Sequence, residues 1–156
     1  MMIKNLLIVP IVLANALLFA ACGSAATSST HLGTKNLIVT SSVRKSLLDA
    51  DAAYHSLPAS DYVGLARGTT YYAFDPQNDR YYAAAGLVAN SKSLQAQVGT
   101  QDDGAYNLFT KKSDSAKWTV YNDGLGGAED SICPIVIPAP VRKVWNWTMH
   151  PCYPNA

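Results

Sequence analysis

Three histidines are the side chains in this sequence best suited to acid–base chemistry: His31, His55 and His150. None has an acidic partner at a spacing known from catalytic motifs, and no Gly-X-Ser-X-Gly elbow places a serine nucleophile in the chain. His55 lies at the end of a predicted helix, whose C-terminus favours a cation, and this explains it without catalysis. A single glutamate also makes a paired-carboxylate hydrolase unattractive, although aspartates could take that role. The sequence therefore predicts no catalytic residue and no cofactor.

The acidic residues closest to a metal-binding pattern are Asp123, Glu129 and Asp130, which lie on either side of a glycine-rich run. Oxygen ligands of this kind suit Ca²⁺, which takes several of them in a flexible geometry. Their spacing matches no known calcium loop, so a plain surface loop is the favoured interpretation. The same glycines lack the Gly-Lys-Ser/Thr ending of a phosphate-binding loop. We therefore predict no metal site.

The N-terminus has the three parts of an export signal. Lys4 gives a positive start, an apolar stretch runs from Leu6 to Phe19, and small residues precede Cys22. The apolar stretch is shorter than the ~20 residues of a membrane-spanning helix, and no other segment has that character. Residues 1–21 are therefore predicted to be removed.

The segment Phe19-Ala20-Ala21-Cys22 resembles the lipobox of bacterial lipoproteins, except that phenylalanine stands where the family usually has leucine. The resemblance implies that Cys22 is diacylated on sulfur and becomes the new N-terminus. Two acyl chains hold a protein stably on a bilayer, whereas one gives marginal binding. The expected location is thus the extracytoplasmic face of the cell membrane, with the lipid bilayer as a partner. Cleavage by an ordinary signal peptidase near Ala21 is the alternative, and it would give a freely secreted protein.

The predicted mature chain carries no net charge. Removing 21 of the 156 residues leaves 135, and the loss of Lys4 leaves 11 basic and 11 acidic side chains. A nucleic-acid-binding protein would carry a basic footprint, which is missing here. The pair Lys111-Lys112 falls in a predicted turn, where solvated charge is ordinary. No nucleic-acid partner is therefore expected.

Cys133 and Cys152 remain once Cys22 is assigned to lipid, and an even number of cysteines in an exported domain predicts a disulfide between them. Closing a loop of about 20 residues contributes roughly 3 kcal/mol in the chain-entropy view. A redox-active pair is the alternative. It would be favoured by Cys-X-X-Cys spacing, which these two residues lack.

Period-two, β-prone runs between Thr69 and Tyr121 predict an antiparallel meander of four or five strands. Asp75-Pro76 ends the first run and favours a hairpin with the second, although three alanines make the second run a weak strand. Residues 94–101 alternate apolar and polar side chains and predict a further strand, followed by a tight turn at Asp102-Asp103-Gly104. The expected strands are Thr70–Phe74, Tyr81–Val88, Leu94–Gln101, Ala105–Thr110 and Lys117–Tyr121.

Helices are predicted on both sides of the meander in the sequence. Ser41-Ser42 offers an N-cap for a helix over Val43–His55, whose apolar side we expect to pack on the sheet. Residues 36–40 are either an edge strand or the lead into that helix. Val141–Trp147 is a second, short helix, closed by the disulfide. The prediction is one α+β domain over residues 36–156, preceded by a flexible tether over residues 22–35.

Aromatic side chains are the most suggestive feature for binding, because adjacent tyrosines of a strand point to opposite faces of a sheet. Some must therefore leave the core face, and tyrosine and tryptophan are enriched at recognition surfaces. Alternatively, the second face is covered by the C-terminal segment with Trp145 and Trp147. The candidate binding residues are Tyr72, Tyr82, Tyr106, Trp118 and Tyr121.

Four segments resemble a group of small exported, often lipid-anchored, actinobacterial-type proteins: Leu57–Tyr62, Thr70–Pro76, Gln101–Tyr106 and Trp118–Gly124. The resemblance spans roughly Val43 to Trp147 and implies a shared fold and an extracytoplasmic site, but no active residues.

The expected function is a non-enzymatic interaction module, which presents an aromatic sheet face to an envelope protein or ligand. On this interpretation, alanine at Tyr72 and Tyr82 weakens partner capture without unfolding the domain. One alternative is a small-molecule binder or hydrolase with a pocket between helix and sheet, lined by Asp61 or His55. Another is an inhibitor of an envelope enzyme.

Overall fold

The tyrosine-rich hairpin forms as predicted. In the structure, a computed structural model, β3 (Tyr71–Asp75) pairs antiparallel with β4 (Arg80–Ala89). The Asp75 carboxylate holds the turn between them, because it accepts the backbone N–H of Gln77 at 3.2 Å and the side-chain amide of Asn78 at 2.7 Å. The turn residues that predicted the hairpin therefore also stabilise it.

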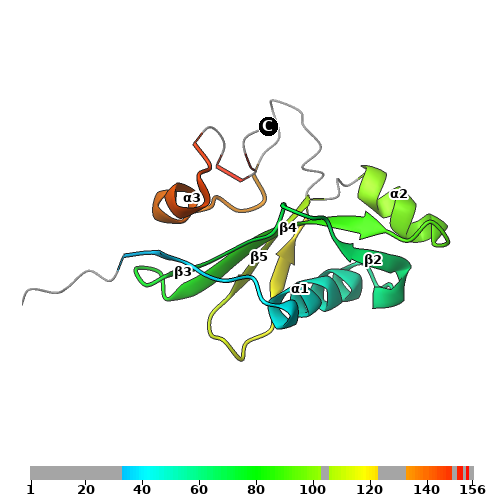
Figure 1. Ribbon diagram of the computed structural model, residues 1–156, viewed down its shortest axis with the longest axis horizontal. Helices are drawn as coiled ribbons and strands as arrows, with labels where there is room; N and C mark the ends of the chain where they lie inside the picture. The colour runs from blue at the N-terminus through cyan, green and yellow to red at the C-terminus, as the bar shows by residue number, and fades with distance from the viewer. Residues whose placement is uncertain (1–32, 103–105, 123–132, 149–150, 153, 155–156) are drawn as a thin grey trace, which may run out of the picture. The chain divides into compact units, whose positions relative to one another are not determined.

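The structure describes residues 33–102, 106–122, 133–148, 151–152 and 154. The predicted signal, Cys22, the tether up to residue 32, the acidic glycine-rich loop and His150 lie outside these residues. The described part of the chain is α+β, with a six-stranded antiparallel sheet and three helices (Figure 1). None of its helices is long and apolar enough to cross a bilayer.

The alanine-rich run is the centre of the sheet. β4 is its longest strand, and Ala83, Ala84 and Ala85 are fully buried. Ala83 lies opposite Tyr72 and Ala84 lies opposite Tyr71, so each small side chain leaves room for a neighbouring ring. A strand buried on both faces loses the polar–apolar alternation that sequence analysis looks for.

β4 has neighbours along both edges. One edge pairs with β3 and then with β2 (Tyr62–Leu65), while the other pairs with β5 (Tyr106–Lys111), which is followed by β6 (Thr119–Tyr121). β1 (Lys35–Asn36) is a short edge strand on β3. The strand order is β1-β3-β4-β5-β6, with β2 on β4.

Gly86 of β4 lies in close contact with the connection between β2 and β3. The Gly86 N–H donates to the Thr69 hydroxyl at 3.0 Å, and that hydroxyl donates to the carbonyl of Ala66. A Cβ on Gly86 would lie 3.1 Å from the same hydroxyl oxygen. Only glycine allows this close approach without displacing the threonine.

The strand predicted over Leu94–Gln101 is wrong. These residues form the helix α2 (Leu94–Asp102), in which Leu94 and Val98 are exposed and Ala96 is fully buried. Leucine, glutamine and alanine favour a helix, and the Ser93 hydroxyl accepts the Ala96 N–H at 3.3 Å as an N-cap does. The predicted turn after it fails as well, since Asp102 is helical and residues 103–105 are not described. Local helix propensity overrode a period-two pattern.

The two other helices lie on opposite sides of the sheet (Figure 1). The N-cap of α1 (Ser41–Tyr54) is Thr40 rather than Ser41 or Ser42, because the Thr40 hydroxyl accepts the Val43 N–H at 3.2 Å. Its Leu47 is fully buried against Phe109 and Tyr72.

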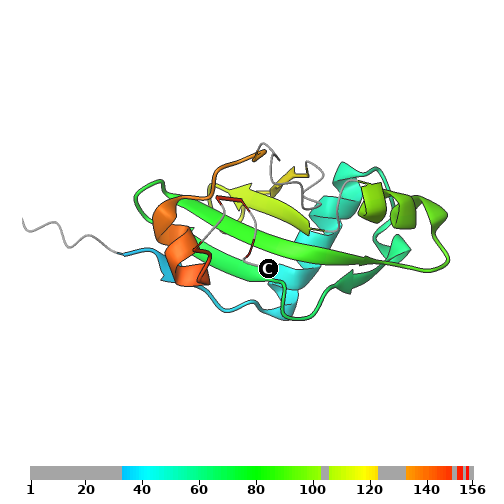
Figure 2. The same cartoon turned by 90° about the horizontal axis from the view of Figure 1, so that it is seen from above.

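α3 (Ala139–Trp145) packs on the other face through Val141 and Trp145. It lies over one end of the sheet and α2 over the other (Figure 2). The predicted disulfide is confirmed: Cys133 and Cys152 are joined, with their Cα atoms 5.6 Å apart. A backbone hydrogen bond from Ile137 to Pro151 holds the same segment together.

Asp51 is the buried carboxylate of α1. Its Oδ1 accepts the Asn107 amide at 2.8 Å and lies 3.8 Å from the His55 ring nitrogen. Burial raises the pKa of Asp51 to about 6, an effect that His55 and the Tyr62 hydroxyl partly offset. In the unfolded chain the same group titrates near pH 4.

Replacing Asp51 by asparagine is expected to change the pH dependence of stability. The folded state binds the Asp51 proton more tightly than the unfolded state does, so this stabilisation is present below pH 4 and lost as the pH rises through 6. The stability of Asp51→Asn relative to wild type should therefore increase by roughly 2–3 kcal/mol between pH 4 and pH 7. Urea denaturation at four pH values measures it, with the exposed Asp49→Asn as control. Parallel curves for wild type and Asp51→Asn would contradict this assignment.

Candidate functional site

The five candidate aromatic residues divide between two buried faces of the sheet. Tyr72 and Trp118 lie on the α1 face, while Tyr82, Tyr106 and Tyr121 lie on the α3 face. The predicted alternation of adjacent tyrosines is confirmed, because Tyr71 and Tyr82 pack with the α3 cluster and Tyr72 and Tyr81 with the α1 cluster.

The exposed aromatic sheet face expected from the sequence is a wrong prediction. Tyr72 and Tyr82 are only 6% and 5% exposed to solvent, and their side chains point to opposite faces of the sheet. On the α3 face, Trp145 and Trp147 lie 5.7 and 5.3 Å from the Tyr71 ring, so the C-terminal segment is the cover. Alanine at Tyr72 and Tyr82 would therefore damage two cores rather than one binding surface.

A cleft opens instead between α1 and the loop that joins β5 to β6. Its volume is about 630 Å³, within the range of small-molecule sites. One side is the outer face of α1, the floor is Tyr72, and the far side is the loop up to Trp118. We call it the α1 cleft. It is lined by Ser42, Val43, Ser46, Asp49, Ala50, Ala53, Tyr72, Lys111, Asp114, Ala116, Lys117 and Trp118.

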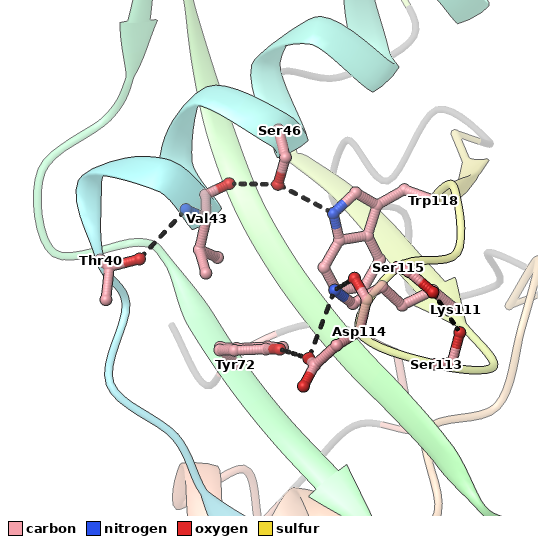
Figure 3. Close-up of polar contacts among 9 residues, drawn as sticks. All are labelled: Thr40, Val43, Ser46, Tyr72, Lys111, Ser113, Asp114, Ser115 and Trp118. Atoms are coloured by element: carbon pink, nitrogen blue, oxygen red, sulfur yellow. Dashed lines mark hydrogen bonds and ion pairs between the residues drawn. The ribbon is translucent and has the colours of Figure 1, made fainter.

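Trp118 ties the two walls of the α1 cleft together (Figure 3). Its indole N–H donates to the Ser46 hydroxyl at 3.0 Å, and that hydroxyl donates to the Val43 carbonyl at 2.8 Å. The Trp118 ring also meets Phe109 edge-on, with centroids 6.3 Å apart. The ring position is thus fixed by a hydrogen bond from one side and by the core from the other.

Lys111 lies in a cage of three aromatic rings. Its ammonium is 4.7 Å from the Trp118 centroid, 5.1 Å from that of Tyr81 and 6.0 Å from that of Tyr72. It donates to the Asp114 carbonyl at 2.9 Å, and its side chain is only 9% exposed. A cation over an aromatic face is stabilised by the ring quadrupole, so the cage compensates for the lost hydration. The sequence signal for it was a lysine directly after a predicted strand, a position where solvated charge is the ordinary expectation.

The Tyr72 hydroxyl lies 3.5 Å from the Asp114 carboxylate (Figure 3). This contact connects the floor of the cleft to the loop between β5 and β6. Burial, with the nearby negative charge of Asp114, raises the pKa of Tyr72 to about 12. Tyr72 is therefore neutral at physiological pH and serves as a hydrogen-bond donor. The α1 cleft offers a ligand apolar walls, two rings and charges of both signs at its rim.

The residues expected to mark a hydrolase pocket lie elsewhere. Neither Asp61 nor His55 lines the α1 cleft. Asp61 accepts the Ser93 hydroxyl at 2.9 Å beside α2, and His55 contacts Asn122 and the buried Asp51. Within the described residues, no three His, Cys, Asp or Glu side chains come together as metal ligands.

Comparison of the chain with models of protein families, with characterised proteins and with solved structures finds no match in any of the three.

Ser46 and Trp118 are expected to be energetically coupled. A part-buried hydrogen bond contributes about 1 kcal/mol, so the double-mutant cycle of Ser46→Ala and Trp118→Phe should give a coupling of about 0.5–1.5 kcal/mol. Urea denaturation of the four proteins measures it. Additive effects, within about 0.3 kcal/mol, would mean that the indole N–H does not hold the cleft walls together.

Proposed function

We propose that the chain is a lipid-anchored, extracytoplasmic binding module and that its ligand enters the α1 cleft. In this proposal the N-terminal helix covers the meander and supplies one wall of the binding site. The observation that carries it is the cleft itself, which has an aromatic floor and is the right size for a small molecule.

The lipid anchor is supported by the sequence alone. Phe19-Ala20-Ala21-Cys22 has the order of a processing site followed by an acylated cysteine, after a short apolar stretch. Cys133 and Cys152 are paired with each other, so Cys22 is the one cysteine that remains for another chemistry. An unpaired thiol would be unfavourable in an exported protein.

The shape of the α1 cleft favours a ligand with a flat or apolar body. Val43, Ala50 and Ala53 form an apolar strip on α1 that faces the Trp118 ring. Asp49 and Lys117 offer charges of opposite sign at the rim. An amphipathic molecule would bury its body against the strip and pair its polar groups at the rim.

Binding without catalysis fits the α1 cleft, because three of its polar side chains already have partners within the protein. Lys111 is held by three rings and by Asp114, Asp49 is paired with Lys45, and Trp118 with Ser46. A general base or nucleophile needs a free group with a suitable pKa near the reacting atom. These side chains serve as structural supports.

The anchor is tested by the intact mass of the protein from a native-like bacterial host, in membrane and soluble fractions. Wild type should carry acyl mass on Cys22 and partition with membranes, and Cys22→Ala should lose both. Cys22→Ala leaves the Cys133–Cys152 disulfide in place, so its folded core is the internal control. A wild-type protein that is processed but unacylated would instead indicate free secretion.

A further inference from the structure

A second concave site lies beside the α1 cleft, at the end of β5 and β6, and it is strongly basic. Its volume is about 240 Å³. Four of the residues that line it are cationic, three carry hydroxyl groups and none is acidic. We call it the basic groove. It is lined by Arg80, Lys111, Lys112, Lys117, Thr110, Thr119, Tyr121 and Ala116.

Three of the four cations of the basic groove form no ion pair within the described residues. Arg80, Lys112 and Lys117 form none of the ion pairs found there, which involve Lys45, His55 and Lys111. Lys111 is the fourth cation, and the Asp114 carboxylate lies 3.7 Å from its ammonium and 3.5 Å from the Tyr72 hydroxyl (Figure 3). Three unpaired cations around one hollow attract an anion, and arginine and lysine both bind phosphate oxygens.

The register of the sheet places the groove at the end where the chain enters the domain. Lys35 lies opposite Phe74, Phe74 opposite Tyr81, and Tyr81 opposite Lys111, so one row of residues crosses four strands. Strands are spaced about 4.8 Å apart, which puts the two lysines about 14 Å apart.

The next row contains the entry point itself. The Thr34 hydroxyl donates to the Asp75 carboxylate at 3.2 Å, and Asp75 lies opposite Arg80 in the basic groove. The segment between Cys22 and Thr34 spans at most about 40 Å when fully extended. A lipid anchor on Cys22 would therefore hold Thr34 within about 40 Å of the bilayer surface.

We propose that the basic groove binds the phosphate of an anionic phospholipid headgroup in the bilayer that anchors the chain. This inference rests on the proposed lipid anchor and adds an orientation to it. Anchoring makes the contact intramolecular, so a weak groove is sufficient to hold the domain. The α1 cleft shares Lys111 and Lys117 with the groove and is thereby held at a fixed height above the membrane.

The test holds the domain on vesicles by a route that does not depend on acylation. A chain with Cys22→Ser, in which a hexahistidine tag replaces residues 1–21, is bound to vesicles containing a nickel-chelating lipid. The vesicles are otherwise phosphatidylcholine, with or without phosphatidylglycerol. Amide hydrogen exchange of residues 112–117 is the readout.

Phosphatidylglycerol should slow exchange of these amides, and added salt should restore it. At about 1 kcal/mol for each lysine near the surface, Lys112→Ala with Lys117→Ala should weaken docking about 25-fold. The matched control is Arg67→Ala with Lys92→Ala. It removes two exposed cations near the other end of β4 and should behave as wild type.

The proposal would be overturned if the amide exchange rates of residues 112–117 were the same with and without phosphatidylglycerol. It would also be overturned if phosphatidylglycerol slowed exchange equally in the two double variants. Slowing by soluble glycerol phosphate on phosphatidylcholine vesicles would overturn it as well, because it would identify a soluble phosphate ligand. The proposed anchor fails separately, by an unacylated Cys22 in the intact-mass measurement, and that result leaves the exchange test intact.

Discussion

Replacing Phe109 by alanine is expected to lower the free energy of unfolding by about 3–5 kcal/mol, the largest effect of any single substitution considered. Phe109 is fully buried on the central part of β5. It packs with Leu47 of α1, Tyr72 of β3 and the Trp118 ring. The cavity would therefore loosen the contact between helix and sheet and remove the support behind the cleft wall.

Urea denaturation with a common m-value measures this loss. Ile38→Ala is the control, because it also truncates a large apolar side chain but one that is 85% exposed. Its effect should stay within about 0.5 kcal/mol. A loss below about 1 kcal/mol for Phe109→Ala would mean that α1 and the sheet do not share one core.

The second large effect is expected from removing the disulfide with Cys133→Ala and Cys152→Ala. It should lower the free energy of unfolding by about 3 kcal/mol. The two cysteines are 19 residues apart, and a loop of that length gives this value in the chain-entropy view. Alanine avoids a buried hydroxyl at Cys152, which is fully buried. Wild type reduced with dithiothreitol should lose the same amount.

The structural change caused by removing the disulfide should be confined to the α3 face. Trp145 and Trp147 pack beside the disulfide, whereas Trp118 lies on the opposite side of the sheet. Near native conditions the indole resonances of Trp145 and Trp147 should shift in the double variant and that of Trp118 should not. Unchanged stability in the double variant would contradict the clamping role of the bond.

The parts of the fold that could be predicted from the sequence are those with local causes. Asp75-Pro76 marks a turn whatever surrounds it, and the hairpin of β3 and β4 followed from it. The pairing of Cys133 with Cys152 could be predicted because only two cysteines remain once Cys22 is assigned to lipid. That adjacent tyrosines point to opposite faces of the sheet followed from strand geometry. Strong helix formers predicted a helix over Val43–His55, and α1 runs over Ser41–Tyr54.

The failures have two causes. Residues 94–101 alternate like a strand, yet local helix propensity and the Ser93 cap make them a helix, in which only Ala96 is buried, against α1 and β2 residues. The binding residues failed because the segment that covers them is distant in sequence. Tyr72 and Tyr82 looked available for binding because the sequence does not show which segment covers each face. Trp145 and Trp147, which cover one of them, were the only visible indication.

The α1 cleft could not be derived from the sequence for the same reason. Its walls meet through Ser46 and Trp118, which are 72 residues apart. Lys111 is a surface lysine by every local criterion and becomes buried only because three rings from three different segments surround it. The basic groove depends likewise on the register between β4 and β5.

The central claim, that the α1 cleft is where a ligand binds, is tested most directly by the indole N–H resonances of the three tryptophans. ¹⁵N-labelled protein is titrated with the dialysable molecules extracted from the envelope of the producing bacterium, and Trp118→Phe assigns the Trp118 peak. The Trp118 peak should shift while those of Trp145 and Trp147 stay in place as internal controls.

A matched pair of variants localises the effect. Ala50→Phe places a ring in the cleft and should abolish the shift, whereas Val136→Phe adds the same ring at an exposed position outside the cleft and should preserve it. A shift of Trp145 or Trp147 alone, or a Trp118 shift that survives Ala50→Phe, would place binding elsewhere and contradict the assignment of the site.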